Sequence, residues 1–123
     1  MPWDLKPDRP IYTQLVEHIE WMILSGVYPP GSKLPSVRDL AKEASVNPNT
    51  MQRALAQLEE DRLIITHRTS GRSITEDSEM IQKARIRIAR EQVSEFLEKM
   101  KKLGFDKKEI LSIITGMNEE VGK

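Results

Sequence analysis

A helix that begins at Asn47-Pro48 and carries polar side chains on its first turns constrains this chain more than any other segment. Asparagine is a favourable N-cap, because its side-chain oxygen accepts a hydrogen bond from an otherwise unpaired backbone N–H of the first turn. Proline suits the next position, since its missing N–H costs nothing there and its fixed φ fits a helix. The apolar residues that follow recur at helical spacing and should face a core: Met51, Ala54, Leu55 and Leu58.

The remaining side chains at the start of this helix are polar, and no acidic residue occurs before Glu59. They are Asn49, Thr50, Gln52 and Arg53. Asn, Gln and Arg are the residues that make bidentate contacts to base edges in a DNA major groove. The segment therefore predicts the recognition helix of a DNA-binding protein.

Two further helices are predicted upstream. The first covers residues 11–25, with an apolar stripe and a stop at Gly26. The second covers residues 36–44, with Ser36 as a plausible N-cap. Only Ser45 and Val46 then separate the second helix from the third, which should end near Asp61. This spacing is typical of a helix–turn–helix, whose second helix enters the major groove.

A β-hairpin should follow the three helices. Residues 63–66 and 73–75 contain β-branched runs, and residues 68–72 form the turn between them. Between Arg62 and Thr75 there are three arginines, one histidine and no acid. The whole chain has zero net charge, which argues against strong nonspecific DNA affinity. The local basic strip suits a wing that contacts DNA, and a solvated basic loop is the alternative.

The last third of the chain predicts two amphipathic helices, one from Asp77 to Gly104 and one that begins with Asp106 and Glu109 as a capping box. Two such helices bury too little surface to fold alone, so their apolar stripes must pack on the winged helix, on each other or on a second chain. We favour a homodimer through Ile86, Ala89, Val93, Phe96, Leu97, Met100, Ile110, Ile113, Ile114 and Met117.

The predicted fold is mainly α with a small β-hairpin. A winged helix-turn-helix domain (residues 1–76) is followed by a helical dimerisation segment (residues 77–123). Catalysis is not expected, because there is no glycine-rich phosphate loop and no serine beside a base. Without cysteine, and with only His18 and His67, the chain offers no zinc site and predicts no cofactor. The lack of a signal pattern or a membrane-length apolar run predicts a cytosolic protein.

Several motifs occur in a specific order along the chain: Pro10-Ile11-Tyr12 with Gln14, Pro30-Gly31 followed by Leu34-Pro35-Ser36-Val37-Arg38-Asp39, Val46-Asn47-Pro48-Asn49-Thr50, and Leu103-Gly104-Phe105. The combination resembles the GntR family of bacterial transcription regulators, and within it the short YtrA-like subfamily. The resemblance covers essentially the whole chain. One departure is Arg62, which stands where the family usually has a glycine after the recognition helix.

The resemblance implies a repressor-type regulator that binds double-stranded DNA at an inverted-repeat operator as a homodimer. Its second helix, recognition helix and wing would supply the DNA contacts, with the wing reaching the minor groove. The residues at these positions are Ser36, Arg38, Asn47, Pro48, Asn49, Thr50, Gln52, Arg53, Arg68, Thr69, Ser70, Gly71 and Arg72.

Two alternatives remain at this stage. A winged helix can serve as a protein-interaction module without sequence-specific DNA binding, and the neutral net charge permits this. A small-molecule effector is the second alternative. The roughly 45 residues after the wing give no enclosed pocket of ligand size within one chain. An effector would therefore have to bind at the interface between two chains.

Overall fold

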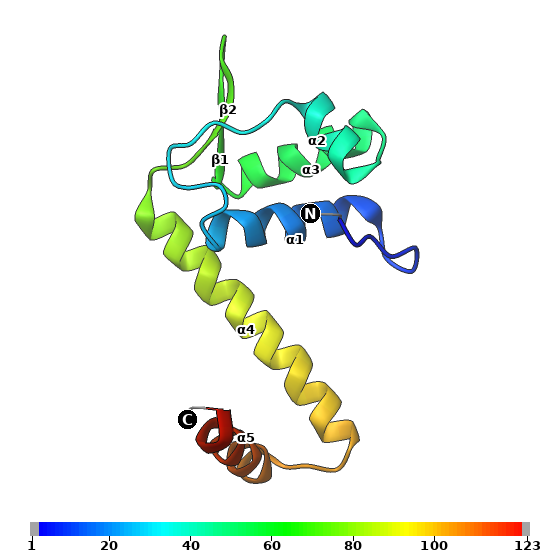
Figure 1. The fold of residues 1–123 in the computed structure, drawn as a ribbon, viewed down its shortest axis with the longest axis vertical. Helices are drawn as coiled ribbons and strands as arrows, with labels where there is room; N and C mark the ends of the chain where they lie inside the picture. Colours follow the sequence, from blue (N-terminus) through cyan, green and yellow to red (C-terminus); the bar gives the residue numbers. More distant parts are fainter. Residues whose placement is uncertain (1–2, 122–123) are drawn as a thin grey trace. The chain divides into compact units, whose positions relative to one another are not determined.

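The computed structural model describes residues 3–121 and divides into two compact units, residues 1–83 and 84–123. The order of elements confirms the predicted fold class, with a winged helix-turn-helix followed by two helices (Figure 1). The elements are α1 (Ile11–Leu24), α2 (Val37–Ala44), α3 (Pro48–Glu60), β1 (Ile64–His67), β2 (Gly71–Ile74), α4 (Ser78–Lys102) and α5 (Lys107–Val121). Among the described residues, no helix is long and apolar enough to cross a membrane.

The core of the first unit forms where α3 packs against α1 and α2, and Figure 1 shows α1 running alongside α3. The four apolar residues predicted to face inward from α3 are all buried, with Met51, Ala54 and Leu58 at 0% exposure. From α1, Leu15 and Ile19 are equally inaccessible. Each of the buried leucine, isoleucine and methionine side chains contributes about 1.5–3 kcal/mol through removal of apolar surface from water, so the orientation of α3 about its own axis is strongly determined.

Both helix starts of the helix–turn–helix are capped as predicted. The Ser36 hydroxyl accepts a hydrogen bond of 3.1 Å from the backbone N–H of Asp39. The side-chain oxygen of Asn47 accepts one of 2.8 Å from the N–H of Asn49. Between the two helices, Ser45 adopts a left-handed conformation with φ of 58°, which ends α2 and turns the chain toward α3.

The wing is an antiparallel hairpin in which Ile64 pairs with Ile74 and His67 pairs with Gly71. Its turn is shorter than predicted, because Gly71 and Arg72 lie in β2 and only residues 68–70 connect the strands. Gly71 has φ of 83°, a conformation that glycine adopts without steric cost, and this lets β2 begin directly after the tight turn. The segment around Ser32–Leu34 then pairs with the other edge of β2, through Leu34 N–H to Arg72 O at 2.8 Å and Ile74 N–H to Ser32 O at 2.8 Å.

The residues before α1 are held against that helix by Gln14, whose side chain is buried although it is polar. The Gln14 amide donates to the carbonyls of Lys6 (2.6 Å) and Arg9 (3.0 Å), and its oxygen accepts from the N–H of Lys6 (2.7 Å). The Trp3 ring also stacks on His18, with 4.1 Å between the ring centroids. Residues 3–10, ahead of α1, are therefore part of the folded unit.

In the second unit, the predicted capping box at the start of α5 is present. The Asp106 N–H donates to Glu109 Oε1 at 3.0 Å, and the Glu109 N–H donates to Asp106 Oδ1 at 2.8 Å. Of the ten residues predicted to form an interface, Ile110 is buried, and Leu97 and Met100 are half-buried. The other seven are exposed in the single chain: Ile86, Ala89, Val93, Phe96, Ile113, Ile114 and Met117.

Arg62 carries backbone strain that a glycine would remove. It follows α3 with φ of 64°, in the left-handed region that costs an L-residue about 1 kcal/mol or more. We expect Arg62→Gly to raise the free energy of unfolding by about 1 kcal/mol, measured by chemical denaturation. Arg68→Gly is the matched control, because it also removes an exposed arginine but from a residue without a positive φ. An equal gain in both variants would show that lost charge, and not relieved strain, is responsible.

Candidate nucleic-acid interface

The first two turns of α3 present polar side chains to solvent. Asn49, Gln52 and Arg53 are exposed, as are Asn47 and Pro48 at the helix start, whereas Thr50 is half-buried. The side-chain oxygen of Asn47 is occupied by its capping hydrogen bond to the Asn49 N–H, so its amide N–H₂ group is the part left for an external acceptor. Asn49 and Gln52 have both a donor and an acceptor to offer, which is the chemistry that reads an adenine edge.

The start of α2 supplies two more of the predicted contacts, Ser36 and Arg38, and both are exposed. Within the described chain, Arg38 forms no ion pair with Asp39 or Glu43, the two acids close to it in sequence. Its guanidinium therefore has no internal ion-pair partner. This leaves it available to bind a phosphate or a guanine.

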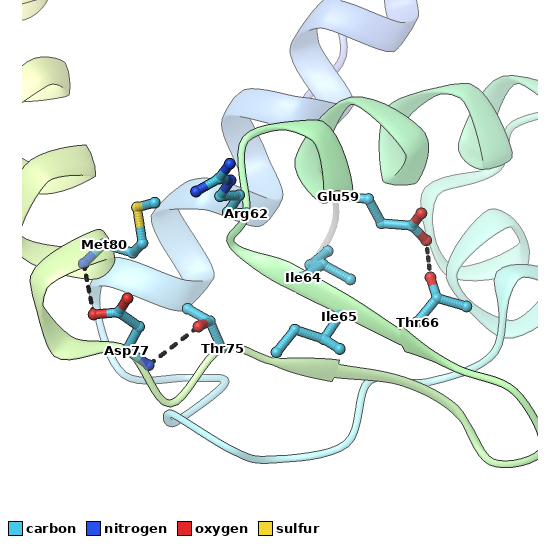
Figure 2. A pocket seen from close by; sticks show the side chains of 8 residues that line it. All are labelled: Glu59, Arg62, Ile64, Ile65, Thr66, Thr75, Asp77 and Met80. Atoms are coloured by element: carbon cyan, nitrogen blue, oxygen red, sulfur yellow. Dashed lines mark hydrogen bonds between the residues drawn. The ribbon is translucent and has the colours of Figure 1, made fainter.

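The wing divides into an exposed tip and an anchored base. Arg68, Thr69, Ser70 and Gly71 are exposed at the tip. Arg72 is half-buried, and its Nε donates to Glu59 Oε1 at 2.8 Å. Figure 2 shows that Glu59, at the end of α3, also accepts a hydrogen bond from the hydroxyl of Thr66 on β1. One carboxylate thus ties the wing to the recognition helix, an arrangement that sequence reasoning did not predict.

These contacts change the protonation behaviour of Glu59. Its pKa lies below the ordinary value, first because the Thr66 hydroxyl donates to the charged carboxylate and second because Arg72 does the same, while partial burial opposes the shift. The carboxylate is therefore ionised at neutral pH and binds Arg72 through a charge-assisted hydrogen bond. Of the two predicted wing arginines, Arg68 is at the tip, and Arg72 is held to Glu59 through its Nε–H, which leaves its terminal guanidinium N–H groups as the donors for an external phosphate.

A hollow of about 510 Å³ lies at the base of the wing (Figure 2). Its acidic side chains already have internal partners, since Glu59 accepts from Thr66 and Arg72. The other acid, Asp77, accepts from the N–H groups at the start of α4, at 3.0 and 3.3 Å. In the part of the chain that the structure describes, no group of three or more histidine or acidic residues could hold a metal ion.

Arg53 has a specific neighbour on another helix. Its guanidinium carbon lies 3.7 Å from the centroid of the Tyr12 ring, which is in the first turn of α1. Among the described residues Arg53 forms no ion pair with an acid, and its guanidinium stacks on this aromatic face. The sequence signal for this pair was the Pro10-Ile11-Tyr12 motif, whose structural role could not be assigned from spacing alone.

Comparison with known proteins agrees with this geometry. The family described as "Bacterial regulatory proteins, gntR family" matches residues 11–74. The uncharacterized HTH-type transcriptional regulator YhcF of Bacillus subtilis is 36% identical over 111 residues, which cover 90% of this chain and 92% of YhcF. The HTH-type transcriptional repressor YtrA of the same organism is 40% identical over 75 residues, or 61% of this chain and 58% of YtrA.

A solved structure extends the similarity to both units. A GntR family transcriptional regulator from Listeria monocytogenes is 40% identical, with a TM-score of 0.84 over 91% of this chain and 98% of the Listeria chain. The shared fold therefore includes the helices that follow the wing. These relatives bear the names of transcriptional regulators.

The link between Glu59 and the wing can be tested through stability. We expect Glu59→Gln to lower the free energy of unfolding at pH 7 by about 0.5–1 kcal/mol, because it removes a partly exposed ion pair. Since the folded-state pKa is depressed, the stabilisation is present above the ordinary pKa and is lost as the pH falls through the folded-state value. Denaturation at pH 7 and at pH 3 should therefore show that the free energy of unfolding decreases less between these pH values in Glu59→Gln than in the wild type.

Glu60→Gln is the matched control, because Glu60 is the adjacent residue on α3 and is exposed. Its free energy of unfolding at pH 7, and the decrease in that free energy between pH 7 and pH 3, should be close to those of the wild type. If the two variants behave alike, the carboxylate of Glu59 does not anchor the wing.

Proposed function

This chain belongs to the GntR family of bacterial regulatory proteins, and we propose that it is a repressor that binds an inverted-repeat operator as a homodimer. The observation that carries the proposal is the division of α3 into a buried apolar face and an exposed polar start. A helix capped by Asn47 and anchored in this way holds Asn49 and Gln52 at a defined orientation, as base readout in a major groove requires.

The exposed residues would make different kinds of contact with DNA. Asn49, Gln52 and Arg38 are the candidates for base contacts, and the remaining contacts would set the register through phosphates. At the tip of the wing, Arg68 is the first candidate for the minor groove, because narrow minor grooves attract arginine. The other members of the proposed surface are Ser36, Asn47, Pro48, Thr50, Arg53, Thr69, Ser70, Gly71 and Arg72.

The homodimer is supported by the apolar side chains that the second unit leaves exposed. Val93, Phe96 and Met117 are 55%, 42% and 57% exposed, respectively. Val93, Phe96, Leu97 and Met100 also follow helical spacing, so they fall on one side of α4. Exposed apolar surface of this kind marks protein–protein interfaces. A second copy presents the same surface, which suits a two-fold symmetric pair.

Arg38 tests the DNA surface most simply. On an operator selected from random DNA by the wild type, we expect Arg38→Ala to weaken binding by about 1–3 kcal/mol at fixed salt, the range of a good specific contact. Lys42→Ala is the matched control, because Lys42 is exposed on the same helix but lies in its last turn, and it should bind as the wild type does. Equal affinity of the Arg38→Ala variant and the wild type would remove Arg38 from the interface.

A salt titration of the wild type separates DNA binding from the protein-interaction alternative. Operator affinity should fall steeply as salt rises, because phosphate contacts release counterions. A response that is flat in salt, together with no selected sequence, would favour a protein partner.

The assembly can be tested independently of DNA. Sedimentation equilibrium should give the mass of two chains, and Val93→Glu should weaken the dimer at least tenfold, because a carboxylate would be desolvated in an apolar interface. Gln92→Glu places the same charge at the adjacent exposed position of α4 and should leave the dimer intact. A monomeric wild type, or equal behaviour of the two variants, would contradict the proposed interface.

A further inference from the structure

Tyr12 and Arg53 form a pair at the edge of the proposed DNA surface, and we propose that Tyr12 is a positioning residue for DNA binding. Its ring holds the guanidinium of Arg53 where that group binds a phosphate of the backbone beside the groove that α3 enters. The inference rests on the proposed function, since it assigns a role within the same surface.

The geometry of the pair gives the two residues different roles. The guanidinium carbon of Arg53 lies 3.7 Å from the ring centroid, a distance at which the face of an aromatic ring attracts a cation. Tyr12 is half-buried on α1, whereas Arg53 is exposed on the second turn of α3. One face of the guanidinium is therefore covered by a fixed ring, and its exposed part remains available to an external acceptor.

The surroundings of the pair favour an anion. Beside it lies a hollow of about 630 Å³ lined by Pro10, Ile11, Tyr12, Asn49, Thr50 and Arg53, and this lining contains no carboxylate. Arginine, asparagine and threonine side chains are donors that proteins use toward DNA phosphates. Because Asn49 also lines the hollow, a phosphate bound here would lie next to a proposed base contact.

Arg53 also lacks the partner that would give it a purely structural role. Among the described residues it forms no ion pair, and its stacking on Tyr12 is the interaction that holds it. A long cationic side chain otherwise loses rotamer entropy when it is ordered on binding. Stacking on Tyr12 orders the guanidinium before DNA arrives, which reduces that loss on binding.

The experiment measures affinity for the selected operator and for an unrelated duplex over a series of salt concentrations. The proteins are the wild type, Arg53→Ala, Tyr12→Leu, Tyr12→Phe and the double variant Tyr12→Leu/Arg53→Ala. Tyr12→Phe keeps the aromatic face, whereas Tyr12→Leu keeps apolar bulk without it. Thermal unfolding of each protein verifies that it is folded at the assay temperature.

We expect Arg53→Ala to weaken binding to both duplexes by the same factor, roughly 3–10-fold, and to reduce the salt slope by about one. Such a uniform change marks a phosphate contact, because a base contact would affect the operator more. Tyr12→Leu should weaken binding in the same way but less, and Tyr12→Phe should bind as the wild type does. In the Arg53→Ala background, Tyr12→Leu should have no further effect, because the two residues act as a unit.

Two results would overturn the positioning role while the operator function stands. One is an effect of Tyr12→Leu that is the same with and without Arg53. The other is an unchanged salt slope in Arg53→Ala when Arg38→Ala still weakens the operator complex. A wild type that selects no DNA sequence would instead overturn the proposed function itself.

Discussion

The burial of one face of α3 determines what its other face can do. Met51, Leu55 and Leu58 are almost inaccessible to solvent and pack in the core that α1 and α2 complete. Because a close-packed core resists even small displacements, the helix cannot roll about its axis to present other side chains. The cap at Asn47 determines where the helix begins. The orientation of Asn49 and Gln52 is therefore a consequence of core packing.

Two connections extend this constraint from α3 to its neighbours. Glu59, at one end of the helix, binds Thr66 and Arg72 of the hairpin. In the second turn of the helix, Arg53 stacks on Tyr12 of α1. The recognition helix thus has a polar link to the wing and an aromatic link to the first helix. Each link uses a charged side chain, so the same charges that could meet DNA also stabilise the arrangement of the first unit.

Local signals in the sequence predicted the helix starts well and the long-range pairs not at all. Caps such as Asn47 and the box formed by Asp106 and Glu109 involve residues two or three positions apart, so their spacing can be read directly. The hairpin turn was predicted too long, because the place of Gly71 in β2 depends on its pairing with His67. The partner of Arg72 was missed, because Glu59 reaches it only after α3 and the hairpin have packed.

We propose that the two α3 helices of the homodimer lie one turn of DNA apart. Hydroxyl-radical footprinting on a selected operator tests it most directly, because it maps protein on each strand at the level of single nucleotides. The account predicts two protected patches related by two-fold symmetry, with centres about 10 base pairs apart or a multiple of that spacing. A single asymmetric patch, or protection without any periodicity, would contradict it.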